Sequence, residues 1–245
     1  MTDQPIRPST TVLLVRDGPE GIEVLMVVRQ NDRSQYASAM LFPGGTVDPS
    51  DSDERWLSLC EGAAELDAAE RARRIAGFRE LHEETGIALL QGAEQTPERA
   101  ARESSFYEVV RSSGGRLDLS AMVPFAHWIT PEGAPKRYEV FFRLCWLPTD
   151  MAAISDGQET VAAEWLRPAD AVALGASGQR NLLFPTKCQL ELLAQSRTVE
   201  EALAATRTRR IMPVSPRVER RGERTFLSIP PEAGYPICEF QMATP

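Results

Sequence analysis

The chain has 245 residues, of which 42% are hydrophobic and 25% are charged, a composition typical of a globular protein with a substantial core. Its net charge of −8 at pH 7 argues against nucleic-acid binding over the whole surface. No apolar run is long enough to span a membrane, and the apolar stretch Val12–Val15 is too short for the core of a signal peptide. We therefore expect a cytoplasmic protein that is not inserted in a membrane.

The four cysteines stand far apart in the sequence and form no Cys-x-x-Cys pair: Cys60, Cys145, Cys188 and Cys238. This spacing argues against a zinc site, and a reducing compartment argues against disulfides. We expect buried thiols, because a free cysteine mostly packs as a small hydrophobic residue.

Hydrophobic periodicity and turn residues predict the secondary structure in chain order. The first part contains a strand at Thr11–Val15, a strand at Ile22–Arg29, a short apolar segment at Ala39–Phe42, a helix at Gly62–Thr85, a strand at Ile87–Leu90 and a helix at Pro97–Arg111. The second part contains strands at Val123–Thr130, Tyr138–Leu147 and Val161–Leu166, and helices from Pro168, over Pro185–Gln195 and over Val199–Ala205. The Pro- and Arg-rich residues 207–245 predict no regular element. Strands mixed with helices indicate an α/β or α+β sandwich.

Three carboxylates share one face of the long predicted helix, because residues three and four apart are neighbours there: Glu80, Glu83 and Glu84. One interpretation is a solvated acidic face. Like charges at this spacing, however, repel by about 0.2–0.5 kcal/mol per pair, and the helix dipole disfavours anions in the last turn by about 0.3–1 kcal/mol each. A bound cation would remove both penalties. Ligands that are all oxygen suit a hard ion such as Mg²⁺ or Mn²⁺.

A pair of glycines, Gly44 and Gly45, follows Phe42-Pro43 upstream of this helix. Paired glycines allow the backbone to approach a phosphate group and to direct N–H groups at it. Taken alone, the pair is better explained by an ordinary turn. Together with an oxygen-ligand helix downstream, it indicates a site for a metal ion and a diphosphate.

The two features together resemble the signature of the Nudix hydrolase family, which is Gly, five residues, Glu, seven residues, then Arg-Glu-apolar-x-Glu-Glu-x-Gly-apolar. Gly45 matches the first glycine, and the segment Arg79–Ile87 matches the second half. Thirty-three residues separate Gly45 from Arg79, so the chain departs from the pattern by an insertion of about twenty residues. Counting back from Arg79, the position of the first glutamate, which orients the arginine in the family, holds Arg71, with Glu70 beside it.

The resemblance implies a Nudix-like α/β/α sandwich with a mixed sheet over residues 9–200. We expect insertions at about 48–68 and 95–118, and a C-terminal extension, residues 201–245, that packs on the domain or on a partner subunit. The insertions resemble the branch that includes the peroxisomal coenzyme A diphosphatases. Four further segments carry the same resemblance: His127–Pro131, Arg137-Tyr138, Phe141-Phe142 and Phe184-Pro185-Thr186.

The resemblance also implies the roles of the site residues. Glu80, Glu83 and Glu84 would bind Mg²⁺ or Mn²⁺, and Arg79 belongs to the same catalytic segment. The general base would be Glu80 or Glu159, and Glu159 is otherwise an exposed loop residue. The substrate would contact Gly44 and Gly45. Two arginines that could also contact it, or could simply lie on the surface, are Arg29 and Arg33.

The resulting hypothesis is an enzyme that hydrolyses the diphosphate linkage of a small nucleoside diphosphate derivative, with coenzyme A or acyl-coenzyme A as the first candidates. The alternatives are a pyrophosphatase for ADP-ribose or NADH and a nucleotide sensor without catalysis. A homodimer is expected only by analogy. The basic stretch Arg207–Arg224 could bind nucleic acid, clamp a subunit, remain solvated or cover the active site, but it has no interleaved aromatic residue, which argues against nucleic acid.

Overall fold

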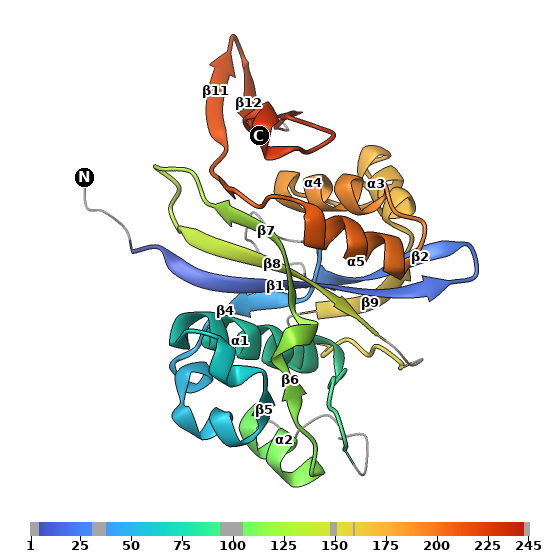
Figure 1. Ribbon diagram of the computed structural model, residues 1–245. Coiled ribbons are helices and arrows are strands. Elements are labelled where there is room, and N and C mark those ends of the chain that lie inside the picture. The colour runs from blue at the N-terminus through green and yellow to red at the C-terminus, as the bar shows by residue number, and fades with distance from the viewer. Residues whose placement is uncertain (1–4, 31–37, 94–104, 148–150, 159, 243–245) are drawn as a thin grey trace.

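A central mixed sheet separates two layers of helices in the computed structural model, which describes residues 5–30, 38–93, 105–147, 151–158 and 160–242. One layer contains α1 (Ala68–Thr85) and α2 (Phe106–Ser113). The other contains α3 (Pro168–Ala176), α4 (Phe184–Leu193) and α5 (Val199–Thr208), on the opposite face of the sheet (Figure 1). The expected α/β/α sandwich with a mixed sheet is confirmed.

The main sheet has the strand order β10-β7-β8-β1-β2-β3, with β4 also paired to β1 and β9 to β2. Its strands are β1 (Arg7–Gly18), β2 (Gly21–Arg29), β3 (Met40–Leu41), β4 (Gly44–Thr46), β7 (Val123–Ile129), β8 (Tyr138–Trp146), β9 (Thr160–Leu166) and β10 (Pro213–Val214). The pairs β1–β8 and β7–β10 are parallel, and the other pairs are antiparallel. The run Val12–Val15 is fully buried because helices cover both faces of the sheet at β1.

Helix α1 begins later than its composition predicts. Asp67 is its N-cap and accepts a hydrogen bond from the Glu70 N–H at 2.7 Å. The residues before it form a 3₁₀ turn, η3 (Ala63–Glu65), so the predicted start at Gly62 is wrong. The helix ends at Thr85, as predicted, because Gly86 adopts a left-handed conformation with φ of 72°. Gly77 brings α1 close to β1, since a Cβ at that position would lie 3.0 Å from the Thr10 methyl group.

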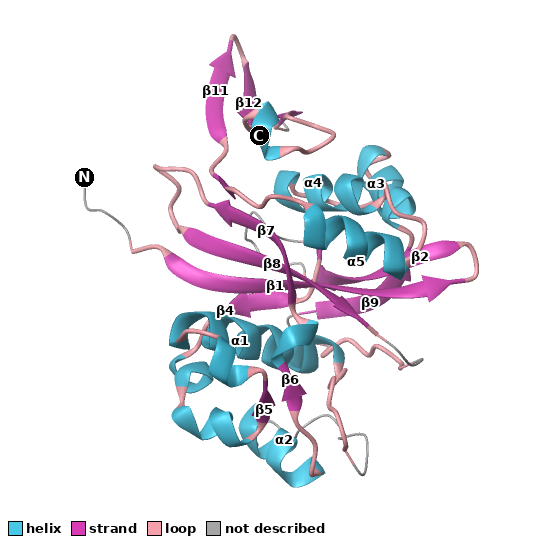
Figure 2. Cartoon of the chain, viewed as in Figure 1, coloured by secondary structure: helices cyan, strands magenta, loops and turns pink. Residues whose placement is uncertain are grey.

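Two segments that are distant in the sequence form one small lobe below α1 (Figure 2). The first contains η1 (Pro49–Ser52), η2 (Glu54–Ser58) and β5 (Cys60–Glu61), and the second contains α2, β6 (Leu117–Asp118) and η4 (Leu119–Ala121). Strand β5 pairs in parallel with β6, and the rings of Trp56 and Phe106 are 5.8 Å apart. The lobe therefore shares one apolar core. The boundaries expected for the two insertions stay a prediction.

Two further predicted elements differ from the structure. Residues 87–90 form no strand, and their apolar side chains reflect burial under the lobe, with Ile87 1% exposed and Ala88 6% exposed. Helix α2 begins at Phe106, after the N-cap Ser105. The start expected at Pro97 lies outside the described residues.

The last part of the chain contains regular structure that its sequence pattern did not predict. A second sheet is formed by β11 (Arg217–Arg221), β12 (Arg224–Ser228) and β13 (Glu239–Gln241), and it projects beyond the layer of α4 and α5 (Figure 1). Between β12 and β13, a 3₁₀ turn, η5 (Pro231–Ala233), precedes Tyr235, which is buried against Trp128 at a ring distance of 5.5 Å. None of the helices described is both long and apolar enough for a membrane span.

Three of the four cysteines are buried free thiols, as expected, and Cys238 is partly buried. Burial raises the pKa of both Cys60 and Cys145 to about 12. These two thiols therefore stay protonated at neutral pH and lack the reactivity of a thiolate.

Candidate metal and diphosphate site

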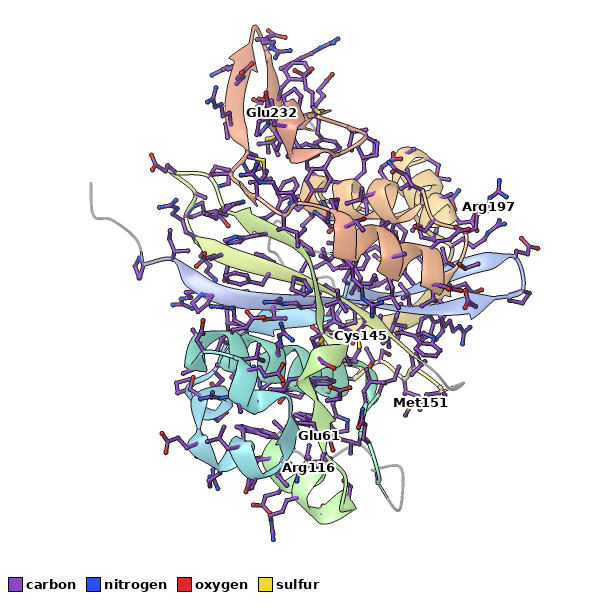
Figure 3. The ribbon with its side chains drawn as sticks, viewed as in Figure 1. Glu61, Arg116, Cys145, Met151, Arg197 and Glu232 are labelled. Carbon is purple, nitrogen blue, oxygen red and sulfur yellow. The ribbon has the colours of Figure 1, made fainter. Side chains whose placement is uncertain are left out.

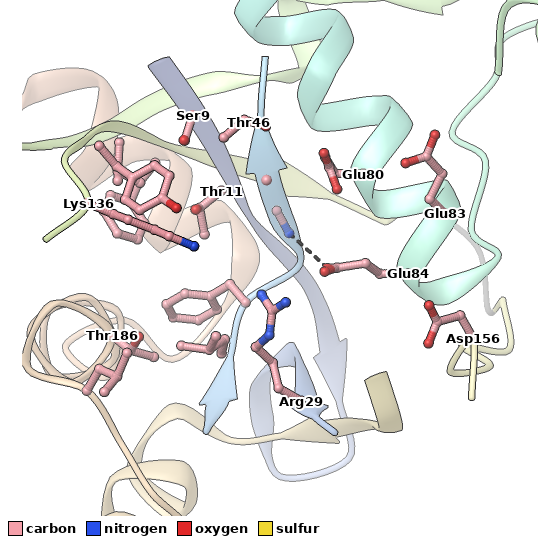
Figure 4. A pocket seen from close by; sticks show the side chains of 18 of the residues that line it. Ser9, Thr11, Arg29, Thr46, Glu80, Glu83, Glu84, Lys136, Asp156 and Thr186 are labelled. Atoms are coloured by element: carbon pink, nitrogen blue, oxygen red, sulfur yellow. Dashed lines mark hydrogen bonds between the residues drawn. The ribbon is translucent and has the colours of Figure 1, made fainter. Parts of the chain in front are cut away.

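An open cleft of about 950 Å³ lies where the C-terminal half of α1 meets β4, β1 and the start of α4 (Figure 4). This volume is within the usual range for sites that bind small molecules and cofactors. The described residues that line it are Ser9, Thr11, Arg29, Leu41, Phe42, Gly44, Gly45, Thr46, Glu80, Glu83, Glu84, Pro135, Lys136, Tyr138, Val140, Phe142, Asp156, Leu183 and Thr186.

The structure brings the three predicted carboxylates of α1 together on one wall of this cleft (Figure 4). The opposite side of the helix carries the apolar residues Ile75, Phe78 and Leu81, which are at most 2% exposed. Their burial fixes the rotation of α1 and so directs the glutamates at the cleft. Glu84 is the most buried of the three, at 6% exposed, whereas the Glu83 side chain is 49% exposed.

The two glycines of β4 allow this strand to approach α1 closely. A Cβ at Gly45 would overlap the Glu80 carboxylate, and one at Gly44 would overlap the Thr10 carbonyl oxygen of β1. The Gly44 N–H donates a hydrogen bond of 2.9 Å to Glu84 Oε2. The glycine pair therefore lines the cleft, as expected. The structure adds a contact that the sequence did not suggest, in which the Gly44 N–H orients the Glu84 carboxylate.

Arg79 connects the helix to two other parts of the chain. Its Nη1 donates to Glu80 Oε1 at 2.8 Å and to Glu83 Oε2 at 2.9 Å, and its Nη2 donates to the Thr46 carbonyl oxygen at 2.9 Å. Its Nε and Nη2 also donate to the two carboxylate oxygens of Asp51, at 2.9 and 3.0 Å. Burial opposes the charged form, but the hydrogen bonds to Asp51 and the surrounding carboxylates raise the pKa of Arg79.

Asp51 is the site residue that the sequence analysis missed. Its side chain is 1% exposed, and its two carboxylate oxygens accept hydrogen bonds from Arg79. The missed signal is a forward count from Gly45: five residues stand between Gly45 and Asp51, which is the spacing of the first glutamate in the signature. The backward count led to Arg71, which instead donates to the Leu66 carbonyl oxygen at 3.1 Å. The extra residues of the signature therefore follow Asp51.

Glu70, which precedes Arg71 in the sequence, forms hydrogen bonds with other residues. Its carboxylate accepts hydrogen bonds from Arg73, Arg74 and Arg143 at 2.7–3.0 Å. Arg74 and Arg143 are largely buried, so Glu70 belongs to a structural ion cluster between α1 and β8. None of these residues lines the cleft described above.

The donor chemistry of the carboxylate wall fits a hard divalent cation. Burial raises the pKa of Glu80, and the nearby carboxylates of Glu83 and Asp51 add to this against the opposing effect of Arg79, so a further positive charge at this carboxylate would be stabilising. Within the described part of the chain, no three Asp, Glu, His or Cys side chains are placed closely enough to hold one ion together. In this arrangement Arg79 Nη1 lies between Glu80 and Glu83. An ion would have to draw the carboxylates together.

The remaining predicted residues divide into two groups. Arg29 lines the cleft, whereas Arg33 and Glu159 lie outside the described residues. Asp156, which the sequence analysis did not select, lines the cleft from the loop before β9 and points toward Glu84 (Figure 4). Its Oδ1 accepts hydrogen bonds from the backbone N–H groups of Gln158 and Thr160 at 2.9 and 2.7 Å, which orders this loop.

The basic stretch Arg207–Arg224 contributes no residue to the described lining of the cleft. Its side chains make local contacts, such as the ion pairs of Arg221 with Glu219 and Glu239, both at 2.7 Å. Figure 3 shows the side chains of this region at the projecting sheet. The stretch therefore packs as part of the second sheet and the end of α5.

The comparisons with known proteins find similarity to Nudix hydrolases. No family model matches the chain. The acyl-coenzyme A diphosphatase NUDT19 of Gallus gallus is 27% identical over 63% of this chain and 56% of that protein. The putative nudix hydrolase 7 of Caenorhabditis elegans is 25% identical over 70% of this chain and 56% of that protein. The chain thus spans about half the length of the curated relatives it matches.

A solved structure extends the likeness to three dimensions. The NUDIX hydrolase from Alicyclobacillus acidocaldarius superimposes with a TM-score of 0.71 and 25% sequence identity, over 82% of this chain and 96% of that chain. The shared fold therefore includes most of the described elements.

Proposed function

We propose that the chain is a Nudix hydrolase that cleaves a diphosphate linkage in a nucleoside diphosphate derivative with Mg²⁺ or Mn²⁺, a proposal that its similarity to Nudix hydrolases supports. The observation that carries this proposal is the wall formed by Glu80, Glu83 and Glu84 beside the glycines of β4. Coenzyme A and acyl-coenzyme A are the first substrates to test, because the relative from Gallus gallus is named for the latter. We also retain a cytoplasmic location and a homodimer as predictions.

Each cleft residue would have a distinct role in the hydrolysis. Glu80, Glu83 and Glu84 would hold the divalent ion, which would supply positive charge against the diphosphate and make the attacking water more acidic. Arg79 and the Gly44 N–H keep these carboxylates aimed at the cleft. Water attacks one phosphorus atom, and the other phosphoryl group leaves with its substituent. The proton of the water passes to a carboxylate oxygen of Glu80 or, as the second candidate, of Glu159.

The test is a substrate panel in ¹⁸O-labelled water. The protein is incubated with Mg²⁺ or Mn²⁺ and with coenzyme A, an acyl-coenzyme A, NADH, ADP-ribose and dinucleoside polyphosphates, and the products are identified by mass spectrometry. We expect two phosphate-bearing products from at least one compound, one of them labelled. The label identifies the phosphorus that water attacks. Binding of a nucleotide without any product would instead favour the sensor.

The variants Glu83→Gln and Glu84→Gln test the assigned carboxylates. We expect each to lower kcat by about a hundredfold or more, because each removes a charge that acts on the developing negative charge of the diphosphate. Glu200→Gln is the matched control, since Glu200 is exposed on α5, across the sheet from α1, and it should keep wild-type kcat. Near-normal activity of either cleft variant at limiting Mg²⁺ would contradict its role.

A further inference from the structure

The cleft has a second polar wall, and its chemistry is opposite to that of the carboxylates. In Figure 4, Glu80, Glu83 and Glu84 lie on one side, whereas Lys136 and Thr186 lie on the other. The second wall combines parts of three elements and the loop before β8, and its polar residues are hydrogen-bond donors: Thr11, Lys136, Tyr138 and Thr186. We call these four residues the donor wall.

Thr186 is the most buried residue of the donor wall. The residue is 5% exposed and lines the cleft, yet its hydroxyl has no hydrogen-bond partner among the residues that the structure describes. The Thr186 hydroxyl is not one of the fully buried atoms that lack a partner, so it is accessible from the cleft. An acceptor in the cleft would satisfy it.

The first turn of α4 provides a second, independent attraction for an anion. Thr186 is in this turn of a ten-residue helix, and the N-cap Leu183 has no side chain that can accept a hydrogen bond from the first N–H groups. Leu183 itself lines the cleft, so this uncapped end opens toward it. The partial positive charge of a helix N-terminus favours a phosphate there.

Lys136 adds a full positive charge to the same wall. The residue is exposed, and its ammonium group points into the cleft (Figure 4). It forms no ion pair within the described ranges, and it is one of two lysines in a chain of net charge −8. The hydroxyls of Thr11 and Tyr138 likewise have no partner among the placed residues. One cation and three hydroxyl donors match the several acceptor oxygens of a phosphate.

We propose that the donor wall binds a phosphomonoester on the nucleoside part of the substrate, separate from the diphosphate at the carboxylate wall. The proposal rests on the proposed function for the position of the diphosphate. It implies that the protein selects substrates that carry this extra phosphate over the same compounds without it. Lys136 and Thr186 are then specificity-determining residues.

The binding test uses nucleotides that cannot be hydrolysed, so it is independent of the proposed reaction. Isothermal titration calorimetry compares AMP with adenosine 3′,5′-bisphosphate and adenosine 2′,5′-bisphosphate. We expect wild-type protein to bind one bisphosphate at least tenfold more tightly than AMP, as one charge-assisted contact provides. Lys136→Met and Thr186→Val should each reduce this ratio, and Lys136→Met should bring it close to one. Thermal unfolding checks that both variants fold.

Lys187→Met is the matched control. Lys187 is the other lysine and follows Thr186 in α4, but it does not line the described cleft, so its replacement should leave the affinity ratio unchanged. Equal wild-type affinity for AMP and both bisphosphates, or no binding, would overturn the proposal. It would also fail if the donor-wall variants weakened AMP and the bisphosphates by the same factor, because the donors would then contact the phosphate that these ligands share.

The outcome of this test is separable from that of the substrate panel. Where the panel gives a product, the ratio of kcat/KM for coenzyme A and for dephospho-coenzyme A should fall by about tenfold in Lys136→Met. A bisphosphate preference without any product would support the donor wall and reject the proposed reaction. Hydrolysis products without a preference for a bisphosphate would support the proposed reaction and reject the donor wall.

Discussion

Asp51 holds the guanidinium group of Arg79 through two hydrogen bonds, at 2.9 and 3.0 Å, from a position that is almost fully buried. Its replacement by asparagine removes the charge and one of the two acceptors, while Arg79 keeps its contacts with Glu80, Glu83 and Thr46. We expect Asp51→Asn to lower the free energy of unfolding by about 1–3 kcal/mol and kcat by about tenfold or more. Urea denaturation and steady-state kinetics measure the two effects.

Asp51→Glu is the conservative comparison for this prediction. The family signature has a glutamate separated from the glycine by five residues, so the longer carboxylate should restore most of the kcat that asparagine loses. A purely structural role would affect stability in both variants without a parallel change in kcat. Wild-type kcat in Asp51→Asn would therefore contradict a positioning role.

The projecting C-terminal sheet contacts the main domain through apolar packing and through a few buried polar contacts. Trp128 Nε1 of β7 donates to the Tyr235 hydroxyl at 2.8 Å, and the Gln189 side chain of α4 lies 3.3 Å from the same oxygen. All three residues are buried. Tyr235→Phe leaves the indole N–H and the amide without this partner, so we expect the free energy of unfolding to fall by about 1–3 kcal/mol.

Urea denaturation measures this change, and Tyr107→Phe is its control. Tyr107 packs on Trp56 at a ring distance of 5.1 Å, and its hydroxyl forms no hydrogen bond with any residue the structure places. The control should change stability by less than about 0.5 kcal/mol. If Tyr235→Phe were as stable as the wild type, the hydroxyl would not anchor this sheet.

On the scale of the whole molecule, the carboxylate wall is complete only when three distant parts of the chain meet. Strand β4 orients Glu84, Asp51 of the lobe orients Arg79, and α1 carries both side chains. A divalent ion that binds this assembled wall binds only the folded state. It should raise the free energy of unfolding by about 2.7 kcal/mol when its concentration is 100 times its dissociation constant. For a chain of this size, the thermal midpoint should rise by roughly 5–10 °C.

Thermal unfolding with and without Mn²⁺ measures this shift, and EDTA should reverse it. The double variant Glu83→Gln, Glu84→Gln should lose most of the shift, and Glu200→Gln should keep it. An unchanged shift in the double variant would place the ion elsewhere.

The sequence predicted the elements whose burial is regular. Strands β1, β2, β7, β8 and β9 and helices α4 and α5 agree with their predicted ranges to within a few residues, because each has an apolar face or a fully buried run. The strand expected at Ile87–Leu90 was wrong, since burial alone does not distinguish a strand from a covered loop. Strand β11 could not be predicted because all five of its residues are exposed, so no apolar alternation marks it.

The candidate site was predictable where its residues are neighbours along one helix. Glu80, Glu83 and Glu84 share a face because of helical spacing, and this holds before any tertiary contact forms. Asp51 could have been predicted from its spacing after Gly45, but only if the insertion is placed between Asp51 and Arg79 and not before Asp51. The structure resolved this through the hydrogen bonds to Arg79.

By itself, the sequence determined the local features of this protein: the carboxylate face of α1, the glycine pair before it and the resemblance to one family. Only the tertiary structure decided that Thr11, Lys136 and Thr186, which are far apart in the chain, line one cleft. The physical reason is the parallel pairing of β1 with β8, which places Thr11 opposite Phe142, together with the packing of α4 on that sheet. Strand pairing and helix packing join distant segments, and local periodicity carries no information about which segments meet.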